Sequence, residues 1–267
     1  MDKTSFIGLI LGIIAIGVGM VLKGVSPAAL INPGALLIIF VGTAASVCIA
    51  FPMSTIKQVP ALFKILFTEA KHGNTIHNVI GTFTNWADLT RREGVLSLES
   101  EIDQVSDPFL ASGLQLVVDG KSPDFIRDVM LEKIDAMEER HQKGIQVFSQ
   151  AGTYAPTLGV LGAVIGLIAA LGNLNDIDVL GHAISAAFIA TLFGIFSGYV
   201  LWHPFANKLR EKSKDEVKLK QIMIEGILSI TNGESAQVVK DKLSSYLSQK
   251  ELAKLNQEDD YATEETA

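Results

Sequence analysis

Four stretches of the sequence contain no charged side chain and are long enough to cross a bilayer. They span residues 4–22, 32–51, 152–171 and 183–202. A helix rises about 1.5 Å per residue, so about 20 apolar residues cross a hydrocarbon core about 30 Å thick. A single central Lys, Arg or Asp would cost about 2.5–3.5 kcal/mol on insertion. The pattern therefore predicts four transmembrane helices.

The third and fourth stretches each contain a stripe of small residues at helical spacing. The stripes are Gly152, Ala155, Gly159, Gly162, Gly166 and Ala170 in the third, and Ala183, Ala187, Ala190, Gly194 and Gly198 in the fourth. Small residues let two backbones approach closely, which is how helices associate in lipid. The stripes predict a smooth wall for another helix, and Pro156 predicts a kink or break near the start of the third span.

The charged block between the second and third spans is predicted to fold as helices. Apolar residues recur at helical spacing over 75–90, Gly94 interrupts them, and a shorter helix is expected over 95–105. Ser122-Pro123-Asp124 is a helix start signal. No uncharged loop separates that helix from the third span, which is consistent with one long rod.

These patterns predict an all-α integral membrane protein with four transmembrane helices and a helical cytoplasmic domain. The expected parts are a first membrane hairpin (1–51), a cytoplasmic domain (52–150), a second membrane hairpin (151–202), cytoplasmic C-terminal helices (203–255) and an acidic disordered tail (256–267).

Basic residues predict the orientation of the chain. With both termini inside, the outer loops 23–31 and 172–182 hold only Lys23 of the 22 Lys and Arg residues. Residues 52–150 and 203–267 then carry ten each on the inner side. The positive-inside rule therefore predicts cytoplasmic termini.

The sequence contains none of the motifs expected of an enzyme or of a metal, cofactor or nucleic-acid site. The membrane spans also contain no Asp, Glu, Lys or Arg, and their polar groups are hydroxyls such as that of Thr191. A proton or cation path normally needs an ionisable side chain at depth. If ions pass here, the carboxylate must come from a partner chain.

Three segments together resemble the MotA/PomA subunits of the flagellar stator, and most closely the proton-type MotA of Gram-positive bacteria. They are TYAPTLGVLGAVIGLIAAL (153–171), GHAISAAFIATLFGIFSGYVLWHPFANKL (181–209) and WADLTRREGVLSLES (86–100). The resemblance covers nearly the whole chain and implies a bacterial inner-membrane protein. It also implies a pentamer around a MotB-like partner, which supplies a membrane Asp and a peptidoglycan-binding domain.

The resemblance further implies that proton passage turns the ring against a rotor switch protein of the flagellar C-ring. Arg91 and Glu99 match the family's rotor-facing charge pair, with Arg92 and Glu101 as neighbours. Pro156 and Pro204 match two family prolines at the inner ends of the third and fourth spans, and Thr191 matches the hydroxyl thought to face the partner's Asp. Sodium-type members usually carry a hydroxyl where this chain has Ala163. A methyl group there favours protons, because sodium needs oxygen ligands when it sheds water.

Two alternatives remain open from the sequence. An ExbB/TolQ-type energiser has a similar pair of small-residue spans, but it usually has three spans and lacks the Arg91 to Glu99 segment. A self-contained channel or transporter would conduct ions without any partner.

Overall fold

The computed structural model describes residues 3–68, 76–172, 174–247, 249 and 252–253. The predicted disordered tail, 256–267, lies outside the described residues. The chain divides into two compact units. The first comprises Met1–Glu69 and Arg140–Lys212, and the second comprises Ala70–Glu139 and Ser213–Ala267. The described residues form helices and no strand, which confirms the all-α prediction.

The prediction of four membrane-spanning helices is confirmed, since four helices are long and apolar enough to cross a membrane. The first is α1 (Lys3–Leu22). The second is formed by three consecutive helical segments: α2 (Pro33–Leu36), the π-helix η2 (Leu37–Val41) and α3 (Gly42–Ala50). The third lies in α9 (Pro123–Leu171), and the fourth runs from α10 (Ile177–Phe196) through the π-helix η5 (Ser197–Trp202) into α11 (His203–Thr231).

Helix α9 is one uninterrupted helix of 49 residues, as the missing loop before the third span indicated. The helix does not break at Pro156, which lies inside it. Proline removes the donor that would bond the carbonyl four residues earlier, here that of Gly152. The predicted break is absent, and the turn that contains Pro156 packs closely against Gly198 of the fourth span, as described below.

Aromatic rings hold one end of the first unit together. Two short helices, α4 (Met53–Ile56) and α5 (Val59–Phe67), follow the second span in the sequence. The ring of Phe63 on α5 lies 5.0 Å from that of Phe148 and 6.1 Å from that of Phe205, measured between centroids. Lys212 caps the end of α5 by donating to the carbonyl oxygens of Ile65 and Thr68, both at 2.6 Å. Both interactions fix α5 against the ends of the membrane helices that carry Phe148 and Phe205.

The second unit is a helical bundle around a continuous apolar core. Its other elements are α6 (Ile76–Glu93), the 3₁₀ helix η4 (Val95–Leu98), α7 (Glu99–Ile102), α8 (Pro108–Val118) and α12 (Ala236–Ser244). Phe83, Leu114, Ile126, Met130 and Ile227 are fully buried in the core. Gly94 ends α6 with a positive φ of 86°, as the predicted interruption requires. The short helix expected over 95–105 follows it as the 3₁₀ turn η4, which continues directly into α7 and ends at Ile102.

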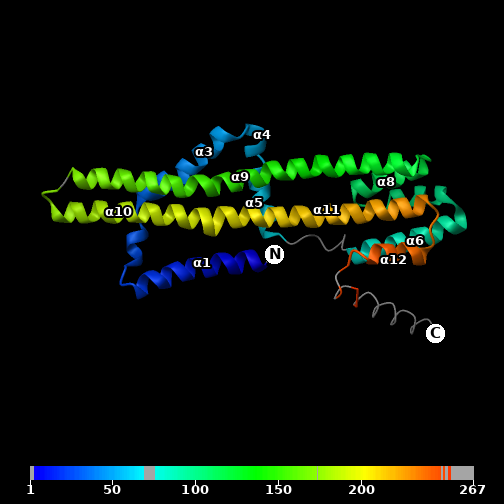
Figure 1. Ribbon diagram of the computed structural model, residues 1–267, viewed down its shortest axis with the longest axis horizontal. Helices are drawn as coiled ribbons and strands as arrows, with labels where there is room; N and C mark the ends of the chain where they lie inside the picture. The colour runs from blue at the N-terminus through cyan, green and yellow to red at the C-terminus, as the bar shows by residue number, and fades with distance from the viewer. Residues whose placement is uncertain (1–2, 69–75, 173, 248, 250–251, 254–267) are drawn as a thin grey trace. The chain divides into compact units, whose positions relative to one another are not determined.

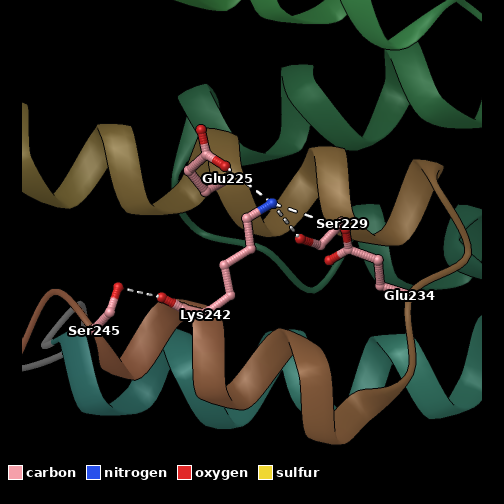
Figure 2. Close-up of polar contacts among 5 residues, drawn as sticks. All are labelled: Glu225, Ser229, Glu234, Lys242 and Ser245. Atoms are coloured by element: carbon pink, nitrogen blue, oxygen red, sulfur yellow. Dashed lines mark hydrogen bonds and ion pairs between the residues drawn. The ribbon is translucent and has the colours of Figure 1, made fainter.

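A polar cluster joins α12 to α11 within this unit (Figure 2). The Lys242 ammonium on α12 lies 3.2 Å from the Glu225 carboxylate and donates to the Ser229 hydroxyl at 3.2 Å. A second carboxylate, that of Glu234, lies 3.9 Å away. The cluster orients α12, while the apolar contacts of Val239 and Leu243 with the core provide most of the burial.

A buried ion pair fixes the start of α8. The Asp107 carboxylate accepts a hydrogen bond from the Phe109 backbone N–H at 2.9 Å, which caps the helix. Its other oxygen lies 2.6 Å from the Lys220 ammonium, and the two side chains are only 10% and 9% exposed. Lys220 also lies 4.8 Å from the centre of the Phe109 ring. Asp107 therefore neutralises a cation that would otherwise be buried without a counter-charge.

Candidate ion-path face and rotor-facing segment

The third and fourth spans run antiparallel, side by side, and pack through their small residues (Figure 1). A Cβ built on Gly159 would lie 3.1 Å from the Ala190 carbonyl oxygen and 3.1 Å from the Gly194 Cα. A Cβ on Gly166 would lie 2.9 Å from the Ala187 Cβ. We call this contact of Gly159, Gly162 and Gly166 with Ala187, Ala190 and Gly194 the α9–α10 interface.

The small-residue stripes are therefore used inside the chain. The sequence indicated a smooth wall for another helix, but the two stripes face each other and leave little of their surface for a partner. Gly194, Ala190 and Ala187 are all buried in the single chain. A partner helix must contact other positions of these two spans.

Two of the predicted ion-path residues, Thr191 and Ala163, lie on the side of this hairpin away from the second span. On α10, Ile189 packs with Ala35, and the Phe193 ring lies 6.5 Å from that of Phe40. Thr191 is two residues from Ile189 and two from Phe193, and two residues correspond to a rotation of about 200° around the helix. Thr191 therefore points away from the second span. On α9, Leu158 meets Gly42 of the second span, and Ala163 is five residues further, about 140° around the helix.

We define the ion-path face by Pro156, Ala163 and Thr191. All three are half-buried in the single chain. Thr191 lies beside the turn that contains Gly159, since a Cβ on that glycine would be 3.4 Å from the Thr191 Cα. Gly159 and Ala163 are one helical turn apart on α9. The Thr191 hydroxyl and the Ala163 methyl group are therefore about one turn apart along the same face.

The hydroxyl of Thr191 donates to the Ala187 carbonyl oxygen at 3.2 Å. Its hydrogen is therefore engaged within its own helix, and its oxygen keeps lone pairs that accept from an incoming donor. A protonated carboxylic acid is such a donor, whereas a carboxylate is not. This geometry suits a group that meets a carboxyl side chain in its neutral form.

Pro156 packs against the fourth span at the end of this face nearest to η5. A Cβ on Gly198 would lie 2.7 Å from the Pro156 Cγ and 2.8 Å from the Gly152 carbonyl oxygen, the acceptor that lost its helical donor. Glycine at 198 is therefore what allows the close approach. Pro204 differs, since it is exposed near the start of α11, directly after the π-helix η5.

The candidate rotor-facing segment, residues 86–101, belongs to the second unit and presents its charges to solvent. Arg91 and Arg92 lie in the last turn of α6, and Glu99 lies in the first turn of α7. Each charge has the sign that the helix dipole favours at that end. Between them Leu98 is fully buried, which anchors the segment to the core. The backbone thus holds exposed charges at defined positions.

Arg91 and Glu99 do not form an ion pair with each other in the part of the chain that the structure describes. Both side chains are exposed, and their charges are available to another protein. Arg92 is also exposed, and its Nε donates to the Asp88 carbonyl oxygen at 3.3 Å.

Glu101 has a different environment from the other three. It is half-buried, and its Oε2 accepts from the Trp86 indole N–H at 3.1 Å. The two side chains line a cavity of about 540 Å³ together with Asn85, Arg92 and Gln104. Glu101 therefore connects α7 to α6, and it contributes to the position of the segment as well as to its charge.

Comparison with known proteins agrees with these observations. Residues 101–222 match the MotA/TolQ/ExbB proton channel family. Motility protein A of Bacillus subtilis is 61% identical over 254 residues, which cover 95% of this chain and 94% of that protein. The chain belongs to this family. The resemblance drawn from the sequence is confirmed, and as a close homologue of a stator subunit the chain is not an enzyme.

Solved structures of family members have the same fold. The flagellar MotAB stator complex from Bacillus subtilis contains a chain that matches with a TM-score of 0.90 at 60% identity, covering 95% of this chain and 99% of that one. The C. jejuni MotAB structure matches with a TM-score of 0.88 at 30% identity, covering 93% and 97%. The four-span, all-helical architecture is therefore that of the MotA subunit.

Several contacts of this MotA homologue could not be found from the sequence. The Trp86–Glu101 hydrogen bond and the buried Asp107–Lys220 pair join residues 15 and 113 positions apart. No local spacing indicates such pairs. Lys220 follows several lysines in the sequence, and this local pattern gives no sign that its side chain is buried.

Proposed function

We propose that the chain is the stator subunit of a flagellar motor and forms, with a MotB-like partner, a proton-conducting complex that drives the rotor. The observation that carries the proposal is the ion-path face. It presents the Thr191 hydroxyl on a hairpin without any Asp, Glu, Lys or Arg between residues 152–171 and 183–202. Such a face needs a titratable group from another chain, and MotB is the second component named in the related MotAB complexes.

The proposed assembly is a pentamer in the bacterial inner membrane with both termini in the cytoplasm. The division into membrane hairpins (1–51 and 151–202) and cytoplasmic parts (52–150 and 203–255) belongs to this proposal. It is supported by the basic residues, of which twenty fall in the two blocks assigned to the inner side. The α9–α10 interface holds each hairpin together, so the ion-path face is free for the partner.

The proposed mechanism follows from the environment of the partner's carboxyl group. Protonated at the outer side, it crosses the low-dielectric region as a neutral group and donates to the Thr191 oxygen. The membrane potential supplies about 2.3 kcal/mol per charge per 100 mV. Release of the proton on the inner side restores the carboxylate, and repetition around the ring produces rotation. Ala163 offers no oxygen ligand, which favours protons over sodium.

The first prediction is that this chain alone conducts no protons. Liposomes that contain only the purified chain should show a leak at background level, because its spans carry no carboxylate. A pH-sensitive dye inside the vesicles measures the flux, and co-reconstitution with the partner should raise it. A large leak from the chain alone would contradict the proposal and favour a self-contained channel.

The second prediction concerns Arg91 and Glu99, through which we propose contact with a rotor switch protein. The double reversal Arg91→Glu, Glu99→Lys should strongly reduce swimming speed and leave the amount of assembled complex unchanged. Single neutralisations should be milder, since exposed charge pairs are worth about 0–1 kcal/mol each.

A matched control for this experiment is the reversal Arg127→Glu, Glu132→Lys at exposed positions of α9 in the same unit. It should leave swimming unchanged. Full speed in the Arg91 and Glu99 double reversal, with an unaltered rotor, would exclude this segment as the rotor contact.

The ExbB/TolQ alternative belongs to the same family, since the matched family includes these proteins. Two features favour the motor function. The chain has the additional N-terminal hairpin, and its 61% identity to a motility protein extends over nearly its whole length.

A further inference from the structure

His203 lies at the inner end of the ion-path face. Gly152, Pro156 and Ala163 recur on α9 at steps of four and seven residues, so they share one side of the helix. The imidazole of His203 lies against the first of these. A Cβ built on Gly152 would be 2.8 Å from each of the ring atoms Cδ2, Cγ and Nδ1. The ring is therefore seated on the backbone of the turn that contains Pro156.

The surroundings of this imidazole contain an aromatic ring and few titratable groups. The Tyr199 ring lies 5.4 Å from it between centroids, and Tyr199 itself is 64% exposed. On the α9 side, residues 149–156 contain one other titratable group, the phenol of Tyr154. On its own helix the nearest charged residues are Lys208 and Arg210. His203 is half-buried in the single chain, so part of the residue stays exposed beside the contact with Gly152.

Residues 152–171 and 183–203 contain one imidazole, that of His203, and their O–H groups are serine, threonine and tyrosine hydroxyls. Serine and threonine hydroxyls hold their protons too tightly, and so do tyrosine phenols. Imidazole is the side chain that exchanges protons most readily in this range. Thr191 and His203 are twelve residues apart, about 18 Å along a helix, so a proton reaches the ring through water rather than directly.

We propose that His203 is the inner proton relay of the complex. This inference rests on the proposed function. A hydrated proton released from the partner's carboxyl group passes to a ring nitrogen, which gives neutral water and an imidazolium. The imidazolium then gives a proton to cytoplasmic water, which regenerates the neutral ring and a hydrated proton. One proton enters and one leaves, and no electron is transferred.

The competing explanation is that His203 only fills space beside Gly152. The two explanations differ in what a small base from solution can do. Removal of a relay imidazole leaves the path intact but without its acceptor, so added imidazole restores flux. Removal of a packing residue disturbs the helix contact, which free imidazole cannot repair.

The experiment measures proton flux through the complete complex in liposomes, with His203→Ala, His203→Gln and the wild-type chain. We expect flux about tenfold lower in both variants, since a positioned acid–base group contributes at least that much to proton transfer. Millimolar imidazole should restore most of the flux in His203→Ala. His182→Gln, an exposed histidine at the other end of the fourth span, is the matched control and should conduct normally.

The outcomes separate this inference from the proposed function. If the His203→Ala complex conducts protons as well as the wild-type complex, the relay is contradicted and the proposed stator function is not affected. Loss of flux in both variants without rescue by imidazole would also overturn it and assign His203 to packing. Absence of flux from the wild-type complex itself would contradict the proposed function. Size-exclusion chromatography of each complex verifies that the variants assemble.

Discussion

Replacement of Gly194 by valine is expected to abolish the stable complex. A Cβ at this position would lie 2.7 Å from the Ala155 carbonyl oxygen and 2.8 Å from the Gly159 Cα. Both are backbone atoms, so no rotamer change can make room, and the two helices must separate. Overpacking of a core commonly lowers stability by about 1–3 kcal/mol. Because the valine side chain would meet backbone atoms at two positions, we expect a loss of stability at or above the upper end of this range. The yield of monodisperse complex after detergent extraction should fall at least about tenfold, since 1.4 kcal/mol corresponds to a factor of ten.

Gly181 provides a matched control on the same helix. No atom lies within 4 Å of a Cβ built there. Gly181→Val should therefore assemble normally and support motility. If Gly194→Val assembles as well as this control, the α9–α10 interface as described is wrong.

Replacement of Asp107 by alanine is expected to unfold the second unit at much lower denaturant concentration. The substitution leaves the Lys220 ammonium buried without a counter-charge and removes the cap of α8. Breaking a buried pair on one side costs about 3–5 kcal/mol. The chain has two tryptophans, one in each unit, at positions 86 and 202. In a Trp202→Phe background, the fluorescence of Trp86 during urea unfolding reports on the second unit alone.

Two further variants separate charge from other effects of the Asp107 substitution. Asp103→Ala, at an exposed position nearby, should leave the unfolding midpoint unchanged. The double substitution Asp107→Asn, Lys220→Met removes both charges and keeps a capping side chain, so it should recover much of the lost stability. An unfolding midpoint for Asp107→Ala equal to that of Asp103→Ala would contradict the importance of this pair.

The sequence predicted the membrane helices well because the signal is local. A charge-free run of about twenty residues identifies a span without knowledge of its neighbours. The same holds for the helix that begins at Pro123, where capping residues mark the start. The short helix predicted over 95–105 is present after Gly94, but apolar spacing did not reveal that it begins as a 3₁₀ turn and ends at Ile102.

The use of the small-residue stripes was beyond what the sequence could determine. Spacing indicates that Gly159 and Gly194 lie on smooth faces, but it does not indicate whether these faces meet each other or a partner. Only the three-dimensional arrangement assigns them to one interface. The hydrogen bond of Glu101 to Trp86 could not be predicted from the sequence either. Glu99 is a glutamate two residues earlier in the same segment, yet it is exposed, and the local sequence does not distinguish the two.

The glycines of the α9–α10 interface also restrict how this protein can evolve. Every single-base change that alters a glycine codon adds a side chain, so at Gly159 or Gly194 each missense mutation introduces a clash with backbone. Ala163 lies on the neighbouring side of α9, and a hydroxyl group there would not enter the interface. If the proposed function holds, substitutions at Ala163 can vary the chemistry that the partner's carboxyl group meets, and with it the driving ion, while the contact between the two helices stays invariant.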